Sequence, residues 1–451
     1  MKAGFDTEES HVRSTERLLI CAALSLLGVQ PPPALAQAAG AGFSTVRRVS
    51  LEEGLRRLET SNLEVRLARH GLASARALTT RAGARTNPGF SAVHEELGGD
   101  GGDYTETILS FAQTLEIGGQ RGLRVNAARG TAGAAEARVD AERLRLAFEW
   151  RRAYARAAQA EEDLGVLAAT TEEFRRVERA GTVRFAEGDV SRFDRSRLRI
   201  ERARYETLLT QAELRVLEAG RELAMLVAPD SLGQGLLVLP DGGLGEMARP
   251  AVPATLEAAL LGASRRPEVV AADAQVEAAR AALGLQRRER VPDLTLSGGY
   301  KHQSDGRTGA VLGLAIPLPL WNRNQGEIAA ASAELDAALE RRALTLARAE
   351  NEILGAWETW SAYEARRELL AGGLLPDSEG LLASARVAYE EGEMSLLELL
   401  DAADAYRSAR EALHRLLADS LIALYELERA TGRLVAPAQN LSSAPSAGGA
   451  R

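Results

Sequence analysis

Few residues of this 451-residue chain combine a reactive side chain with a spacing that could do chemistry. Its histidines are scattered, and no two of them lie three or four residues apart, so the helical spacing of a metal site is missing. They are His11, His70, His94, His302 and His414. The chain also lacks a Walker-type phosphate loop, which predicts that it does not hydrolyse ATP. We therefore expect no enzyme activity, no catalytic residue, no metal site and no cofactor.

Glu398 and Asp401 are the polar pair with the clearest spacing. Because they are three residues apart, they share one face of a helix. A ring of such carboxylates, supplied by several copies of a chain, would need screening by cations or partial protonation, and it would favour cations over anions. Asp404 lies close behind them, so an ordinary solvated acidic face is the alternative interpretation.

Glu398 also ends a pattern that the chain contains twice, at a spacing of 204 residues. Each copy places an aromatic residue, a glycine, a serine and an acid three residues apart: Phe185, Gly188, Ser191 and Asp194, then Tyr389, Gly392, Ser395 and Glu398. The glycine suits a positive φ where a helix ends, and the serine can cap the returning helix. Arg76 and Pro88 align with Arg280 and Pro292 at the same spacing, and a duplication this long predicts two similar structural halves.

Long helices are predicted on both sides of each pattern. The first half is compatible with helix over residues 122–180 and 191–226, and the second over residues 325–388 and 395–429. Gly372-Gly373 and Pro376 predict a kink or break in the third of these stretches. The first stretch alone would reach roughly 90 Å, which no compact domain of this size needs.

Each half also contains a segment of period two between its helices. Apolar residues alternate with small or polar ones at Leu109, Phe111, Leu115 and Ile117, and again at Leu312, Leu314, Ile316, Leu318 and Leu320. Shorter strand candidates precede them near residues 90–97 and 294–302, with turn-forming residues between. Each half is therefore predicted to carry one β-hairpin, over about residues 88–117 and 292–320.

Four amphipathic strands have the alternation of a transmembrane barrel, with lipid outside and water inside. Four strands cannot close such a barrel, and open edges are not tolerated in lipid, so the barrel would have to be shared among subunits. The alternative is a pair of soluble hairpins that cap a helical bundle.

The N-terminus resembles a secretory signal peptide over residues 1–36. An apolar run too short to span a bilayer precedes three prolines and the small-x-small sequence Ala34-Leu35-Ala36. Acidic residues outnumber basic ones before the run, which a translation start at Val12 would explain; a buried apolar helix is the alternative. Lipidation of Cys21 is disfavoured because no small residue precedes it. The formal net charge of −8 gives no footprint for nucleic acid.

The two aromatic-x-x-Gly turns resemble those of the TolC family of outer-membrane efflux channels, and the resemblance extends over about residues 51–434. The ending Ala-Thr-Gly-Arg-Leu at 430–434 is family-like. The sequence PLPLWNRNQGE at 317–327 resembles the heavy-metal branch, which partners exporters of cobalt, zinc, cadmium or copper. A degenerate copy of it lies at 113–122.

This resemblance implies a mainly α fold with a membrane β-barrel: a homotrimer with a shared twelve-stranded barrel and a periplasmic α-barrel. The protein would lie in the outer membrane of a Gram-negative cell envelope, as the passive exit duct of a tripartite efflux system. Its partners would be outer-membrane lipid, a periplasmic adaptor that contacts both tips, and an inner-membrane pump. Glu398 and Asp401 match positions of gate carboxylates, and the alternating strand residues would face lipid.

The predicted organisation is a signal peptide (1–36), a first repeat (37–240), a second repeat (241–436) and a flexible tail (437–451). The main rival is a secreted or envelope-anchored coiled-coil scaffold without transport activity. A periplasmic adaptor is a second rival, but an adaptor would show one helical hairpin rather than two.

Overall fold

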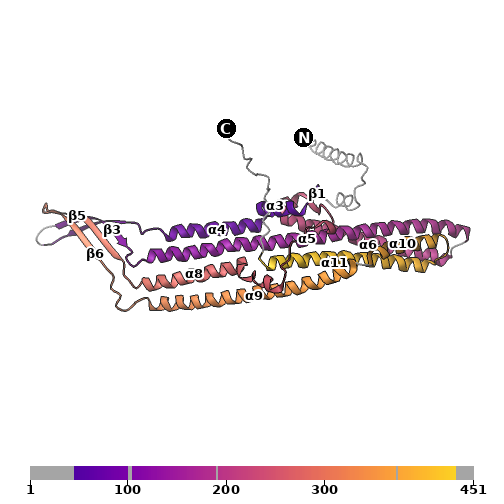
Figure 1. The fold of residues 1–451 in the computed structure, drawn as a ribbon. Coiled ribbons are helices and arrows are strands. Elements are labelled where there is room, and N and C mark those ends of the chain that lie inside the picture. The colour runs from indigo at the N-terminus through magenta and orange to yellow at the C-terminus, as the bar shows by residue number, and fades with distance from the viewer. Residues whose placement is uncertain (1–44, 100–103, 189–190, 372–373, 433–451) are drawn as a thin grey trace, which may run out of the picture.

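The computed structural model describes residues 45–99, 104–188, 191–371 and 374–432. The molecule is elongated: a small sheet occupies one end, long helices run through the middle, and two helical turns form the other end (Figure 1). The predicted signal peptide, Cys21 and the C-terminal tail lie outside the described residues.

Both halves of the chain run through the same order of elements. The first half consists of α4 (Leu63–Ala82), β2 (Gly89–Leu97), β3 (Tyr104–Leu115), α5 (Gln120–Glu187) and α6 (Arg192–Val227). The second consists of α8 (Pro267–Arg288), β5 (Leu294–Gln303), β6 (Thr308–Ala315), α9 (Gln325–Ala371), α10 (Leu374–Glu390) and α11 (Leu396–Ala430). In each half, a helix leads into a hairpin, and the hairpin leads into long helices that turn back at the far end.

The helix boundaries follow the local sequence. The 68-residue helix α5 is longer at both ends than predicted, because it continues until Gly188 stops it. The predicted kink or break at Gly372-Gly373 lies outside the described residues, between α9, which reaches Ala371, and α10, which begins at Leu374.

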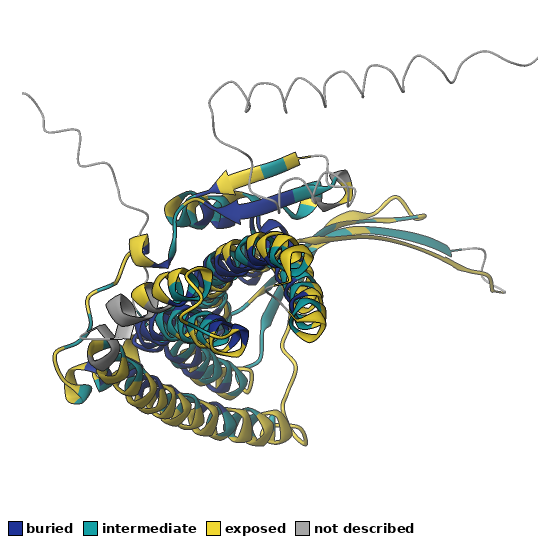
Figure 2. Cartoon of the chain, turned by 90° about the vertical axis from the view of Figure 1, so that its right-hand side faces the viewer, coloured by how far each residue is buried: buried dark blue, intermediate teal, exposed yellow. Residues whose placement is uncertain are grey.

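The helices pack through apolar side chains that lie three or four residues apart. Ile353 of α9 is fully buried, and Trp357 and Trp360 pack against the same cluster with their ring centroids 5.2 Å apart. Leu427 of α11 belongs to this cluster, and Leu424 is also buried. Viewed along the molecule, buried residues lie between the helices and exposed ones on the outside (Figure 2).

A group of short elements beside the middle of α5 was not predicted. Strands β1 (Thr45–Val49) and β4 (Leu236–Pro240) pair in parallel, near α3 (Leu51–Ser61) and the 3-10 segments Pro229–Gln234 and Leu244–Glu246. The short helix α7 (Leu256–Leu260) and the 3-10 segment Ala263–Arg265 pack against α9 instead. Next to α3, Trp150 is fully buried and donates its indole N–H to the carbonyl of Leu51 at 2.9 Å. A Cβ on Gly54 would lie 1.9 Å from the Trp150 ring, so this contact requires glycine.

Candidate functional sites at the two ends of the molecule

The hairpins of the two halves form one antiparallel sheet in the order β2-β3-β5-β6. Residues that pair across the strands share a face, so the register sorts the side chains into two sets. One face is apolar over most of its length and includes Phe90, Leu109, Phe111, Leu115, Leu294, Leu296, Tyr300, Leu312 and Leu314. The opposite face carries small and polar residues in its half nearer the helices, among them Ser91, Ser110, Ala112, Thr114, Thr295, Ser297 and Ala315, and it also includes Val93, Ile108 and Val311.

The apolar face is uncovered within one copy of the chain. Leu312 is 86% exposed, Leu314 64% and Phe111 62%. Phe90 and Phe111, which pair across β2 and β3, contact each other with their rings tilted by 50° and their centroids 5.0 Å apart. An exposed apolar surface of this kind needs lipid or another apolar partner.

The strands end earlier than predicted on the side of the helices. Strand β3 ends at Leu115 and β6 at Ala315, so the assignment of Ile117, Ile316, Leu318 and Leu320 to strands was wrong. Beyond β6, Pro317 and Pro319 have no backbone N–H to extend the ladder. Beyond β3, Gly118 and Gly119 end the strand, and Gly119 has a φ of 78°.

Hydrogen bonds hold together the four segments that cross between the sheet and the helices. Each bond joins residues in or next to two of these crossings: Gln113 Nε2 at the end of β3 to Thr86 O (2.9 Å), Arg121 Nε to Gly83 O (2.7 Å), Gln120 Nε2 to Asp293 Oδ1 (3.1 Å), and Asn324 Nδ2 to Gln286 O at the end of α8 (2.8 Å). Asn324, with a φ of 60°, is the only non-glycine residue with positive φ in the described part of the chain. It precedes α9 as Gly119 precedes α5, so the two halves leave the sheet in a similar way.

The first helical turn, between α5 and α6, lies at the end of the molecule opposite the sheet (Figure 1). Gly188 has a φ of 93°, which confirms the predicted left-handed residue. Ser191 caps α6, accepting a hydrogen bond from the Asp194 N–H at 3.1 Å and donating one to the Asp194 carboxylate at 2.7 Å. The Arg195 guanidinium lies over the Phe185 ring, 4.7 Å from its centroid.

The second turn, between α10 and α11, repeats this geometry and adds a contact. Gly392 has a φ of 81°, and the hydroxyl of Ser395 accepts from the Glu398 N–H at 3.3 Å. The Glu398 carboxylate in turn accepts from both the backbone N–H and the hydroxyl of Ser395, at 2.8 and 2.7 Å. These hydrogen bonds lower the pKa of Glu398. Tyr389 is half-buried, and burial raises its pKa.

The acidic residues after the second turn do not form one solvated face. Glu398 and Asp401 are exposed, whereas Asp404 turns toward α6. Asp404 accepts a hydrogen bond from the Tyr205 hydroxyl at 2.8 Å and forms an ion pair with Arg204 at 3.2 Å. Burial alone would raise the pKa of Asp404, but the Tyr205 and Arg204 contacts lower it. Sequence reasoning missed this contact, because the partners are about 200 residues apart and no local pattern joins them.

A second polar contact that the sequence did not reveal lies deeper between α5 and α11. The buried imidazole of His414 lies 2.8 Å from Asp163 through Nδ1 and 3.7 Å from Glu162 through Nε2. The two carboxylates therefore lie against different ring nitrogens. Within the described residues, no group of three or more histidine, cysteine, aspartate and glutamate residues could hold a metal ion.

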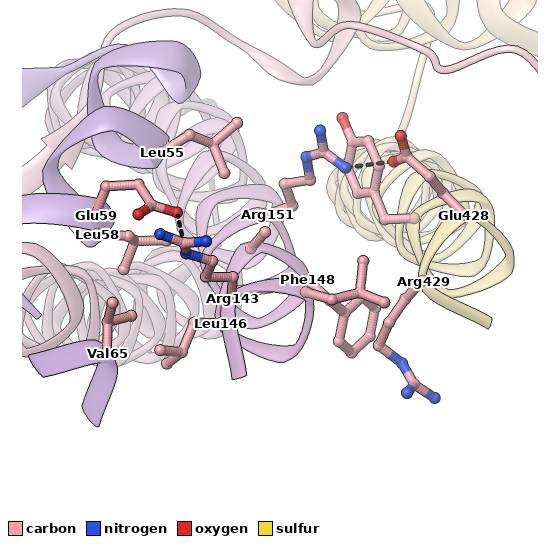
Figure 3. A pocket seen from close by; sticks show the side chains of 13 residues that line it. Leu55, Leu58, Glu59, Val65, Arg143, Leu146, Phe148, Arg151, Glu428 and Arg429 are labelled. Atoms are coloured by element: carbon pink, nitrogen blue, oxygen red, sulfur yellow. Dashed lines mark hydrogen bonds and ion pairs between the residues drawn. The ribbon is translucent and has the colours of Figure 1, made fainter. Parts of the chain in front are cut away.

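A small cavity of about 60 Å³ lies between α3, α4, α5 and α11 (Figure 3). Its wall is mostly apolar, and two ion pairs close its edge, Arg143 with Glu59 and Arg151 with Glu428. The Arg151 guanidinium also lies over the Tyr425 ring, 5.1 Å from its centroid. A space of this size holds about two water molecules, so it offers no room for a substrate.

Comparison with known proteins defines the class to which these features belong. The family model described as "Outer membrane efflux protein" matches residues 54–228 and 261–433, one segment in each half. The protein is thus an outer-membrane efflux channel with a helical periplasmic extension. The chain belongs to the outer membrane efflux protein family, whose members are trimeric channels of tripartite efflux systems.

Similar proteins include resistance proteins of Cupriavidus metallidurans. The chain is 27% identical to the cobalt-zinc-cadmium resistance protein CzcC over 389 residues, which cover 85% of this chain and 90% of the relative. It is 29% identical to the nickel and cobalt resistance protein CnrC over 281 residues, covering 61% of this chain and 63% of the relative.

Solved structures share the fold at lower sequence identity. A membrane protein from Pseudomonas aeruginosa superposes with a TM-score of 0.72 at 21% identity, covering 85% of this chain and 92% of the other. The outer membrane protein VceC from Vibrio cholerae gives a TM-score of 0.68 at 23% identity, covering 85% and 96%. The predicted family and fold class are confirmed. No helix in the described part of the chain is both long and apolar enough to cross a membrane.

Proposed function

We propose that three copies of this chain form the exit duct of a tripartite efflux system that exports divalent heavy-metal cations. The observation that carries the proposal is the amphipathic sheet with two open edges, joined directly to long helices. Strands β2 and β6 have no partner on their outer sides in the described residues. Since unpaired strand edges are not tolerated in lipid, β6 of one copy would pair with β2 of the next.

The substrate class rests on the named relatives. They are resistance proteins against cobalt, zinc, cadmium and nickel, at 27% and 29% identity. The exposed pair Glu398 and Asp401 would place six carboxylates around the axis of a trimer, an arrangement that favours cations. We propose that this ring is the periplasmic constriction and that transport energy comes from the inner-membrane pump.

The helical turns at Gly188 and Gly392 would contact the periplasmic adaptor. Both turns lie at the end farthest from the sheet, as this assignment requires (Figure 1). Cysteines placed beside Gly392 should crosslink to the adaptor, whereas cysteines in the hairpin turn near Gly306 should not. Crosslinks from the hairpin turn alone would reverse the assigned polarity.

The membrane assignment is tested by two neighbouring substitutions on β6. Leu314→Arg puts a charge on the apolar face and should lower insertion, at a cost of about 2–4 kcal/mol near the membrane midplane. Ala315→Arg puts the same charge on the opposite face and should be tolerated. Heat-resistant oligomers in outer-membrane fractions measure the difference. Equal assembly of the two variants would refute the orientation of the sheet and favour the scaffold alternative.

The substrate is tested separately, in cells that lack the outer-membrane channel of a cobalt-zinc exporter. Expression of this chain with its cognate adaptor and pump should restore growth on cobalt or zinc salts. Restored resistance to organic toxicants, without improved growth on metal salts, would support the proposed channel function and refute the proposed metal substrate.

A further inference from the structure

The apolar face of the sheet continues past the last paired residue of β6. Ile316, Leu318, Leu320 and Trp321 follow the strand and are exposed by 46, 73, 60 and 88%. Strand β6 has only eight residues, whereas a tilted transmembrane strand needs about 9–11. The segment 316–321 supplies the missing apolar length.

This segment is suited to lipid although it lies outside the ladder. Backbone N–H groups without partners are costly in an apolar medium. Pro317 and Pro319 have no N–H, and the N–H of Leu320 donates to the carbonyl of Leu318 at 2.9 Å. Trp321, at the end of the segment, is a residue enriched where a membrane meets water.

Exposed arginines lie just beyond this apolar band, where the chain crosses between sheet and helices. They occur at all four crossings and are Arg85, Arg121, Arg287, Arg288, Arg290 and Arg323. We name this set the arginine collar. Five of its guanidinium groups form no ion pair or hydrogen bond with the described residues, and Arg121 donates to the carbonyl of Gly83.

The collar is more basic than the rest of the chain. Residues 83–88, 116–124, 287–293 and 316–327 contain seven arginines and four acids, whereas the whole chain has 55 basic and 63 acidic residues. Glu116 forms an ion pair with Arg124 at 2.7 Å, and Asp293 accepts a hydrogen bond from the uncharged Gln120 amide at 3.1 Å. Apart from the Glu116–Arg124 pair, six arginines face Asp293 and the exposed Glu289 and Glu327, which leaves a positive excess.

We infer that the arginine collar binds anionic phospholipid headgroups of the leaflet that faces the helices, with the segment 316–321 as its apolar anchor. The inference rests on the proposed membrane assignment of the sheet. Its basis is the charge complementarity of the collar to phosphate and the continuity of the collar with the apolar face. Basic residues at this level gain attraction to anionic lipid that falls off within a Debye length.

The test uses the purified full-length oligomer in detergent, to which phosphatidylglycerol or phosphatidylcholine is added. Phosphatidylglycerol should raise the temperature at which the oligomer dissociates more than phosphatidylcholine does, and high salt should remove the difference. The variant that combines Arg85→Gln, Arg288→Gln, Arg290→Gln and Arg323→Gln should lose most of the additional stabilisation by phosphatidylglycerol. The matched control Arg192→Gln with Arg199→Gln, two exposed arginines near the first helical turn, should keep it.

The depth of the anchor is read from Trp321 fluorescence in vesicles that contain brominated phosphatidylglycerol. Trp150 is fully buried, and Trp357 and Trp360 pack in the helical core, so most quenching should disappear in Trp321→Phe. Equal stabilisation by the two lipids, or equal quenching in Trp321→Phe, would overturn the inference. If the wild type conducts ions but shows no lipid preference, lipid binding by the arginine collar is refuted while the proposed channel function is retained. If the wild type never inserts into the membrane, the proposed channel function is itself refuted.

Discussion

The two helical turns are built from one sequence pattern but differ in how the acid at its end is used. At the first turn, Asp194 contacts only the hydroxyl and not the backbone N–H of Ser191 among the described residues. At the second, Glu398 also reaches the backbone N–H of Ser395 and completes a capping box. The additional methylene of glutamate makes this reach possible. The acid is thus part of the helix start, whatever further role its charge has.

The surroundings of the two turns differ as well. Tyr389 packs against a buried cluster beside the second turn, whereas Phe185 at the first is covered by the Arg195 guanidinium. Asp404, one helical turn beyond Asp401, ties α11 to α6 through Tyr205. The second turn is therefore fixed by more contacts than the first, which predicts graded responses to matched substitutions.

The largest effect is expected for valine in place of the turn glycines. A Cβ on Gly188 or Gly392 would meet no atom within 4 Å, so the penalty comes only from the positive φ. For a β-branched residue it should be about 1–3 kcal/mol at each turn. Hydrogen exchange of the adjacent helix ends measures this free-energy penalty. In cells, Gly392→Val should abolish metal resistance while trimers still form. Full tolerance of valine at either turn would contradict the requirement for a residue with positive φ there.

A smaller and unequal effect is expected for the capping serines. Ser191→Ala should destabilise the start of α6 by about 1 kcal/mol, as is typical of a lost helix cap. Ser395→Ala should cost more at the start of α11, because the Glu398 carboxylate also loses the hydroxyl that it accepts from. Hydrogen exchange of the two helix starts compares them directly. A larger loss of protection in Ser191→Ala than in Ser395→Ala would contradict the stronger capping of α11.

The smallest effect is expected from pH. The pKa of Glu398 is held below its ordinary value of 4.5. The stability that its hydrogen bonds contribute is therefore fully present above about pH 4.5 and is lost as the pH falls through the lowered value. Acid should speed hydrogen exchange at the start of α11, after correction for the intrinsic rate, and Glu398→Gln should show no such pH dependence. If protection from hydrogen exchange at the start of α11 stays constant in the wild type as the pH falls, the protonation of Glu398 is not linked to the stability of this helix end.

The sequence was most informative where local rules decide the structure. The duplicated pattern predicted both left-handed glycines, and the period of two predicted both hairpins. It failed where contacts join distant positions. Strand β1 pairs with β4 almost 200 residues away, and five-residue strands carry too little periodicity to be recognised. The strand ends at Leu115 and Ala315 were misjudged because the alternation of apolar residues continues beyond the last paired residue, to Ile117 in the first hairpin and past Pro317 and Pro319 in the second.

Single-channel recording in a planar lipid bilayer tests the central claim most directly. Purified wild-type oligomers should insert and give discrete, cation-selective conductance steps that multivalent cations block. Glu398→Gln with Asp401→Asn should conduct with reduced selectivity and weaker block, whereas Asp194→Asn, at the first turn, should behave as the wild type. Unchanged selectivity and block in the double variant would place the constriction elsewhere. Correctly assembled oligomers that never give conductance steps would contradict the channel itself.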